Sequence, residues 1–420
     1  MFPLPDGFTW LVPLNDGAPL DLDRRKNGDE WIHLVFRRLR ATGFQMSGHA
    51  AFPGGHIYRP SGTEHRTALW VLFPTGQGPI CLVLGDGDPS EVAVEPWRDA
   101  VTHAIGQIGA VTDFAWWTII GCDPNTPDVV ALRLSEPTEV AGLRLVPALE
   151  LFYENVPGRF NIFQSNDRHT GLVKVTGSSM GYNSNVAHEE AARRIRLLCS
   201  LLSVAFGMPW IQRSSVNPLT RFNGHGDTEP MNVDDIHIPA ISPWDRDDEV
   251  PPDTEALTQS VEIPRWIGRR WETITRDKRM VDALLNHHEG QLMMAHHPSH
   301  AALAFVTTVE ALGNRKVKKL PRCRECRVVT GSGDRFRDAL ARVIPAQEAD
   351  ALGRKFYNWR SRTAHDGVLH GTEPAFGAWA FWSGISENTA RDFERELYSL
   401  AAAAQRLLLS EASGEELRPT

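Results

Sequence analysis

The stretch Ser299-His-Ala-Ala-Leu-Ala-Phe-Val-Thr-Thr-Val-Glu-Ala-Leu-Gly313 decides the fold of the second half of the chain. Ser299 is of a type that caps helix N-termini, and glycine often ends helices at the other terminus. Apolar side chains recur between them at the spacing of one helical face, at Ala302, Phe305, Val306, Val309 and Leu312. The pattern predicts a helix over 299–313 with a buried stripe.

Helical patterns continue on both sides of this stretch. Further candidate helices cover 254–276, 279–295, 332–343, 346–364 and 386–410. The last one carries an apolar stripe of Phe393, Leu397, Leu400, Ala404 and Leu407. We therefore expect an all-α helical bundle over residues 254–412, followed by a disordered tail over 413–420.

The first part of the chain has a different pattern. Short apolar runs at 68–73, 80–84, 114–120, 129–134, 143–146 and 172–175 are separated by Gly- and Pro-rich turns. They predict a β-rich, sandwich or barrel-like domain over residues 1–182, with one early helix at 30–40. Asn183 precedes a stripe of apolar residues at helical spacing, which predicts a helix. The stretch 207–260 is rich in Pro, Gly and Asp, which indicates a linker. Residues 183–253 are therefore expected to form a helix followed by an irregular linker. The fold class predicted is α+β, with several domains.

Composition narrows the class of protein. The chain has 420 residues, of which 42% are hydrophobic and 23% charged, as in soluble globular proteins of two or three domains. Its five cysteines are an odd number at scattered positions, which argues against a disulfide framework. No apolar run has membrane-spanning length, and no signal-peptide pattern opens the sequence. We expect a cytoplasmic protein without a membrane partner.

The net charge of −8 is unevenly distributed. Residues 260–410 contain 23 basic and 17 acidic side chains, and residues 314–360 alone contain 13 basic and 5 acidic ones. A basic region of this kind suits a polyanion such as RNA. A solvated charged surface would give the same count, so charge alone leaves both interpretations open.

The segment Phe356-Tyr-Asn-Trp-Arg-Ser-Arg-Thr-Ala-His365 places Arg360 five residues before His365 near the end of a predicted helix. Arginine clamps phosphates with two hydrogen bonds, and histidine transfers protons near neutral pH. Together they supply what phosphodiester cleavage needs without a metal. One histidine cannot easily serve as both base and acid, which implies a two-fold dimer. The spacing alone is equally typical of an arginine paired with a carboxylate and an exposed histidine at a helix end.

The run from Tyr357 to His365 resembles the Arg-x4-6-His motif of HEPN domains, and the nearest likeness is to the ApeA-like subgroup. Val309-Glu-Ala-Leu312 and Asp334-Arg-Phe-Arg337 precede it in the order of that subgroup, and the resemblance covers about residues 255–410. It implies a HEPN-like helical bundle and a metal-independent endoribonuclease that acts as a homodimer, used in bacterial antiphage abortive infection or as a toxin. Arg360 and His365 match the catalytic pair. The N-terminal domain is then expected to bind a phage-derived trigger.

Several neighbours are candidate supporting residues. Tyr357 and Arg362 belong to the same run, and Ser361 stands where many HEPN nucleases have Asn, Asp or His. The motif closes as His365-Asp366-Gly367, one residue longer than usual, while His370-Gly371 offers a second register. Glu310 is interpreted either as a partner that orients Arg360 or as a surface glutamate.

Two alternatives remain for the function. Some HEPN domains are inactive, which leaves a non-catalytic module that dimerises and binds RNA or protein.

Cys323 and Cys326 form half of a structural zinc site, which another subunit or nearby histidines would complete, although a redox or incidental pair fits equally well. A metal-dependent hydrolase would use the histidines of that region, namely His287, His288, His296, His297 and His300. The leading hypothesis requires no cofactor for catalysis.

Overall fold

The structure is a computed structural model, and it describes residues 4–52, 54–61, 67–88, 94–122, 131–147, 152–153, 168–169, 172–222, 228–232, 236, 258–294, 296–315, 331–371 and 388–415. The chain divides into two compact units, Met1–Thr112 and Asp113–Thr420. Within the described residues, no helix combines the length and apolar character required to span a bilayer.

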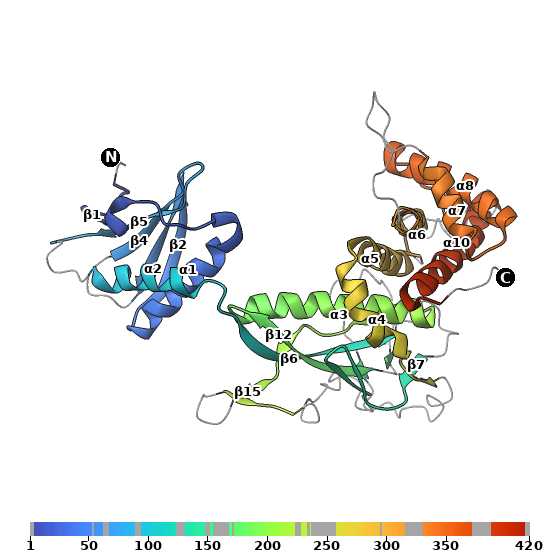
Figure 1. The fold of residues 1–420 in the computed structure, drawn as a ribbon, viewed down its shortest axis with the longest axis horizontal. Coiled ribbons are helices and arrows are strands. Elements are labelled where there is room, and N and C mark those ends of the chain that lie inside the picture. The colour runs from blue at the N-terminus through green and yellow to red at the C-terminus, as the bar shows by residue number, and fades with distance from the viewer. Residues whose placement is uncertain are drawn as a thin grey trace. The chain divides into compact units, whose positions relative to one another are not determined.

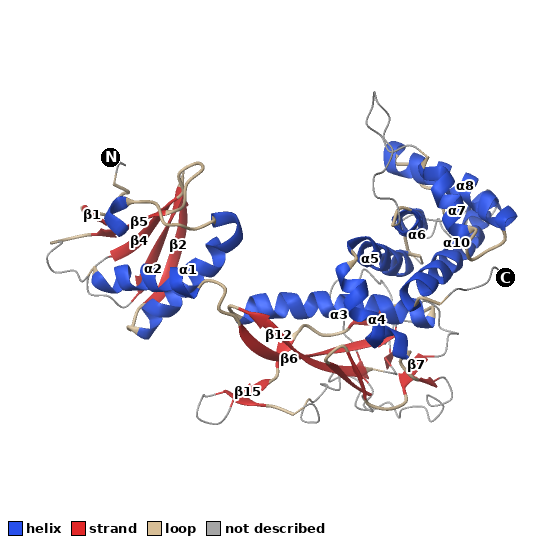
Figure 2. Ribbon diagram, viewed as in Figure 1, coloured by secondary structure: helices blue, strands red, loops and turns tan. Residues whose placement is uncertain are grey.

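The first unit is one antiparallel sheet with two helices. Its strands are β1 (Trp10–Pro13), β2 (Gln45–Phe52), β3 (Gly55–Ser61), β4 (Thr67–Leu72) and β5 (Ile80–Gly85), in the order β1-β5-β4-β3-β2. The helices α1 (Arg24–Ala41) and α2 (Glu95–Gln107) pack on one face of this sheet, as Figures 1 and 2 show. Trp31 and Trp97 are buried there against Val71 and Val83 of the sheet.

The second unit begins with a six-stranded sheet. It contains β6 (Thr112–Cys122), β8 (Thr138–Val140), β9 (Leu143–Pro147), β12 (Val173–Gly181) and β13 (Trp210–Gln212) in the order β13-β6-β12-β9-β8, with β14 (Asn217–Pro218) beside β6. Three two-stranded pairs surround it: β7 (Ala131–Leu134) with β17 (Thr258–Val261), β10 (Phe152–Tyr153) with β11 (Arg168–His169), and β15 (Thr220–Phe222) with β16 (Thr228–Pro230).

Helix α3 (Ser184–Phe206) joins this sheet to the helical bundle. Asn183 caps it by accepting a hydrogen bond from the Val186 N–H at 2.9 Å. Eleven of its residues are buried, because the sheet covers one side and the bundle the other (Figure 1). One hydrophobic core therefore runs from Trp116 of the sheet to Leu407 of the last helix, so the sheet and the bundle form one compact unit.

The bundle contains α4 (Arg265–Arg276), α5 (Lys278–Met293), α6 (Pro298–Gly313), α7 (Ser332–Leu340), α8 (Ala346–Asp366) and α10 (Asn388–Ser413). All six lie within or close to the predicted helices, and the predicted stripes of 299–313 and 386–410 are buried. Helix α6 lies centrally, in contact with α5, α7, α8 and α10. The α+β class with a helical C-terminal region is confirmed, and residues 416–420 of the predicted tail lie outside the described residues.

Three details differ from expectation. The segment 258–261 is strand β17, parallel to β7, because its residues complete a ladder with Ala131–Leu134 and Pro264 then starts α4. Helix α2 was not predicted, although Pro96 in its first turn and a stripe of Trp97, Ala100 and Ala104 are helical signals. Ser299 does not cap α6, since Pro298 begins the helix and His297 is its N-cap.

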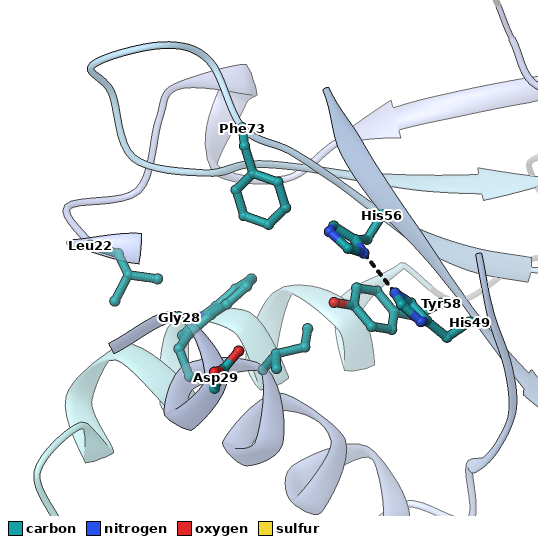
Figure 3. A pocket seen from close by; sticks show the side chains of 9 residues that line it. Leu22, Gly28, Asp29, His49, His56, Tyr58 and Phe73 are labelled. Atoms are coloured by element: carbon teal, nitrogen blue, oxygen red, sulfur yellow. Dashed lines mark hydrogen bonds between the residues drawn. The ribbon is translucent and has the colours of Figure 1, made fainter. Parts of the chain in front are cut away.

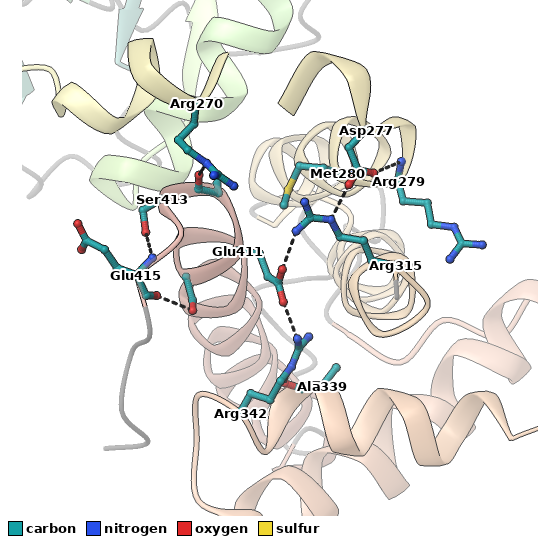
Figure 4. Close-up of polar contacts among 12 residues, drawn as sticks. Arg270, Asp277, Arg279, Met280, Arg315, Ala339, Arg342, Glu411, Ser413 and Glu415 are labelled. Atoms are coloured by element: carbon teal, nitrogen blue, oxygen red, sulfur yellow. Dashed lines mark hydrogen bonds and ion pairs between the residues drawn. The ribbon is translucent and has the colours of Figure 1, made fainter. Parts of the chain in front are cut away.

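An ion-pair network fastens the ends of the bundle helices together (Figure 4). Arg315 donates from Nε to Asp277 Oδ2 at 2.5 Å and from Nη1 to Glu411 Oε2 at 2.6 Å. Arg342 reaches the other oxygen of Glu411 at 2.5 Å. Asp277 also caps α5 by accepting from the backbone N–H groups of Arg279 and Met280. The side chains of Arg315 and Glu411 are only 19% and 14% exposed, so solvent screens this network weakly.

Candidate nuclease site on helices α6, α7 and α8

Helix α8 positions the two residues of the motif. Its Leu352 and Phe356 are buried against the bundle, which fixes the rotation of the helix about its axis. The helix ends at Gly367, which has φ 67° in the left-handed region and donates its N–H to the Arg362 carbonyl. Arg360 and His365 therefore lie in its last turns, beside a glycine C-terminus.

Arg360 is held by two neighbours. Its Nη2 lies 3.3 Å from Glu310 Oε2 on α6, and its Cζ lies 5.9 Å from the centre of the Tyr357 ring. The arginine side chain is 30% exposed and the glutamate 15%. Its buried Nε has no hydrogen-bond partner among the described residues. The 3.3 Å contact with Glu310 uses one of the five N–H donors of the guanidinium, so other donors can bind an anionic oxygen.

Glu310 occupies an unusual electrostatic position. Burial raises its pKa above the ordinary value, while the positive charges of Arg360 and Arg335 act in the opposite direction. Burial is the larger effect. Ionisation of this buried carboxylate therefore costs free energy, and the interaction with Arg360 offsets part of that cost.

His365 is exposed and makes no hydrogen bond or ion pair with any other described residue. Helical geometry separates it from Arg360 by about 7.5 Å along the axis and about 140° around it. One chain therefore presents the two side chains in different directions.

A polar hollow of about 350 Å³ lies beside Arg360, lined by Gly333, Arg337, Gly353, Arg354, Tyr357, Asn358 and Ser361. Arg354, Asn358 and Ser361 share one stripe of α8 with His365, by the three- and four-residue periodicity of a helix. Tyr357 thus contacts the hollow and the Arg360 guanidinium. Of the predicted supporting residues, the structure brings Ser361, Tyr357 and Glu310 together around Arg360 and the hollow.

The arginines of the hollow are partly neutralised. Arg337 pairs with Asp334 and lies 3.6 Å from Asp350, which also pairs with Arg354. Arg337 was predicted only as part of the segment Asp334-Arg-Phe-Arg337, and Arg354 was not predicted as a site residue. One signal was available, since Gly353 stands inside a helix, where glycine is unfavourable. A Cβ there would lie 2.4 Å from the Arg337 side chain, so glycine allows that arginine to cross α8.

His370 has a different environment. Its ring packs at 5.9 Å, centre to centre, from both Trp359 and Phe393. Its backbone N–H donates to Ser299 Oγ at 2.7 Å, which ties the chain after α8 to the start of α6. This packing is structural in character, whereas His365 faces solvent. Arg362 is also exposed, two positions beyond Arg360 on α8.

The structure describes the five histidines predicted as metal ligands but not the two cysteines. Cys323 and Cys326 lie outside the described residues. His287 and His288 are buried in the core; burial lowers the pKa of His287 to about 3, and His288 Nε2 lies 2.7 Å from the Trp210 carbonyl. His296, His297 and His300 are exposed. Across the part of the chain that the structure describes, His, Cys, Asp and Glu side chains form no group of three suited to a metal ion.

No protein-family model matches this chain, and no curated protein matches it in sequence.

Proposed function

We propose that this protein is a metal-independent endoribonuclease of HEPN type, with Arg360 and His365 as its catalytic residues and a homodimer as its active form. The observation that carries the proposal is the placement of Arg360, a half-buried arginine held by Glu310 and Tyr357 at the end of α8 with donors to spare. Such a guanidinium is preorganised for a phosphate.

The chemistry follows from the two groups. The 2′-hydroxyl oxygen attacks the adjacent phosphorus as a His365 imidazole takes its proton, and the bond from phosphorus to the 5′-oxygen breaks. A second imidazole, from the partner copy, protonates the leaving 5′-oxygen. Arg360 neutralises the charge that builds on the non-bridging oxygens. The products are a 2′,3′-cyclic phosphate and a 5′-hydroxyl. An antiphage or toxin role and a phage-derived trigger for the N-terminal part belong to the same proposal.

The polar hollow fits this proposal as a place for the RNA next to the scissile phosphate. Tyr357 offers an aromatic face and a hydroxyl that pairs with Ser332, and Arg354 and Asn358 offer donors. Stacking on aromatic rings and hydrogen bonds from such side chains are how proteins hold unpaired nucleotides.

A non-catalytic module that dimerises and binds RNA or protein is the second candidate. It is favoured by the angular separation of Arg360 and His365 around α8, because one chain alone does not direct both groups at one phosphate. The two candidates agree on an RNA-compatible surface and differ on bond cleavage.

The test is an RNA cleavage assay with the full chain in the presence of EDTA. Wild type is compared with Arg360→Ala, Arg360→Lys and His365→Ala, and with Arg395→Ala as the matched control, since Arg395 is an exposed arginine of α10 paired with Asp392. We expect cleavage by wild type and control, a loss of at least 100-fold in the two alanine variants, and 5′-hydroxyl ends. Lysine restores little, because it lacks the planar fork. Equal behaviour of all five proteins supports the binding module, and activity lost on chelation supports a metal-dependent hydrolase.

A further inference from the structure

The first unit contains a pocket that the proposed nuclease activity does not use. It has a volume of about 240 Å³, and its walls include Asp29, Trp31, His49, His56, Tyr58 and Phe73 (Figure 3). Five of these six side chains are aromatic rings. Apolar walls with a few polar groups are typical of small-molecule sites, and the volume, somewhat below that of a drug-sized site, restricts the ligand to a small ring system.

Backbone register explains why these rings gather. Strands β2 and β3 pair antiparallel with His49 opposite Tyr58 and Ala51 opposite His56. Directly opposed residues share a face, and alternate residues on a strand do as well, so His49, His56 and Tyr58 all lie on one face of the hairpin. The first turns of α1 supply Asp29 and Trp31 to the same pocket, and Phe73 follows strand β4.

The two histidines form a hydrogen-bonded pair. His49 Nε2 lies 2.6 Å from His56 Nδ1, and the ring planes differ by only 8° with centroids 4.9 Å apart. One ring donates its N–H and the other accepts, and Figure 3 shows the bond between facing ring edges. The Tyr58 ring lies nearly parallel to both, at 24° to His49 and 21° to His56. The pair holds a flat aromatic surface in place.

The side chains of the pocket differ in what a ligand can reach. Trp31 is 1% exposed and its indole Nε1 is buried, so this residue contributes packing surface rather than a donor. Asp29 is an exposed carboxylate on the wall of the same pocket and offers an acceptor for N–H donors.

We propose that this pocket binds a planar heteroaromatic ring of nucleobase size, with its N–H edge on Asp29 and its face against the aromatic wall. None of the described residues that line the pocket is a lysine or an arginine, so the described walls offer a phosphate no cationic clamp. A quaternary ammonium ion would suit the rings and the carboxylate. The coplanar rings of His49 and His56 and the nearly parallel ring of Tyr58 form a flat wall, however, which a planar ring covers over a larger area than a tetrahedral ammonium group does.

The test is isothermal titration calorimetry of the full chain with guanosine, adenosine, cytidine and uridine, and with choline as the competing class. Asp29→Asn removes the carboxylate charge at an exposed position and leaves the fold intact, and Phe73→Leu alters the aromatic wall. His103→Ala is the matched control, because His103 is an exposed residue of α2 outside the pocket. Circular dichroism verifies folding of each variant.

We expect at least one nucleoside to bind, with affinity reduced about tenfold or more by Asp29→Asn and several-fold by Phe73→Leu, and unchanged within twofold by His103→Ala. The proposal is overturned if none of the four nucleosides binds at millimolar concentration, if Asp29→Asn binds as tightly as wild type, or if choline alone binds. The RNA cleavage assay is independent of these outcomes, so failure here leaves the proposed nuclease standing, and the reverse also holds.

Discussion

Glu310 Oε2 lies 3.3 Å from Arg360 Nη2, and this contact joins helices α6 and α8 at the candidate catalytic arginine. Because the carboxylate is largely buried, it fixes the guanidinium at some electrostatic cost to itself. We infer that Glu310 is a positioning residue, which acts through Arg360 rather than on the substrate.

Replacing Glu310 by glutamine is expected to lower the cleavage rate about 10- to 100-fold, since the arginine loses its charged anchor. Folding stability should stay constant or rise slightly near neutral pH. The sign follows from the raised pKa: ionisation of Glu310 costs free energy above that pKa, and glutamine does not ionise. Cleavage kinetics and thermal melts measure the two effects. Glu289→Gln, at an exposed ion pair with Arg196, is the control, and a parallel loss of stability in Glu310→Gln would contradict the inference.

The two histidines that follow Arg360 should respond differently to substitution. His365→Ala removes activity and leaves stability unchanged, because the side chain is exposed. His370→Ala lowers stability by about 1–2 kcal/mol, because its ring packs against Trp359 and Phe393. His370→Phe keeps that packing and should retain cleavage. Loss of cleavage in a stable His370→Phe protein would shift the catalytic role to the second register.

Buried His287 predicts a specific acid sensitivity. Its pKa is lowered to about 3 by burial, against about 6.5 in an unfolded chain. Between these values the unfolded state binds the extra proton, so stability falls as pH falls, by up to about 1.4 kcal/mol per pH unit from this group. Urea unfolding from pH 7 to 4 should show a flatter dependence for His287→Leu than for the exposed control His296→Leu. Parallel curves would contradict the assignment.

The network around Glu411 should matter for stability more than a surface pair does. Glu411→Gln weakens contacts to both Arg315 and Arg342, and we expect a loss of about 2 kcal/mol in urea unfolding. Burial alone would raise the pKa of Asp277, but hydrogen bonds from Arg315 and two backbone N–H groups hold it below the ordinary value. Asp277 therefore stabilises the fold above its unfolded pKa, and that contribution is lost as pH falls through the folded pKa. A loss below 0.5 kcal/mol for Glu411→Gln would contradict the expected weak screening.

Much of the helical region follows from local pattern. The stripe of Phe305, Val309 and Leu312 and the N-cap at Asn183 are short-range signals, and the helices form where these signals lie. Strand β17 could not be predicted in this way, because Thr258–Val261 is extended only through pairing with residues more than 120 positions earlier. A ladder between distant segments leaves no local trace.

Part of the candidate site could likewise be predicted from local sequence, and part could not. Arg360 and His365 belong to a local motif. The sequence left two roles open for Glu310, and the structure shows that it contacts the Arg360 guanidinium. The hollow lined by Arg337 and Arg354 requires α7 and α8 to pack, with Gly353 leaving the room between them. Such a surface is created by tertiary contact and is absent from either helix alone.

The claim at the centre of this account is that Arg360 and His365 from two copies of the chain act at one phosphate. The most direct measurement uses differently tagged heterodimers, purified after co-expression, in which one chain is wild type and the other carries His365→Ala or Arg360→Ala. The heterodimer with His365→Ala should lose at least about 100-fold of wild-type cleavage in EDTA, because one imidazole cannot serve as both base and acid, whereas the heterodimer with Arg360→Ala keeps both imidazoles and one guanidinium and should retain at least about a tenth. A His365→Ala heterodimer with about half of wild-type cleavage, or a wild-type protein that cleaves RNA as a monomer, would contradict it.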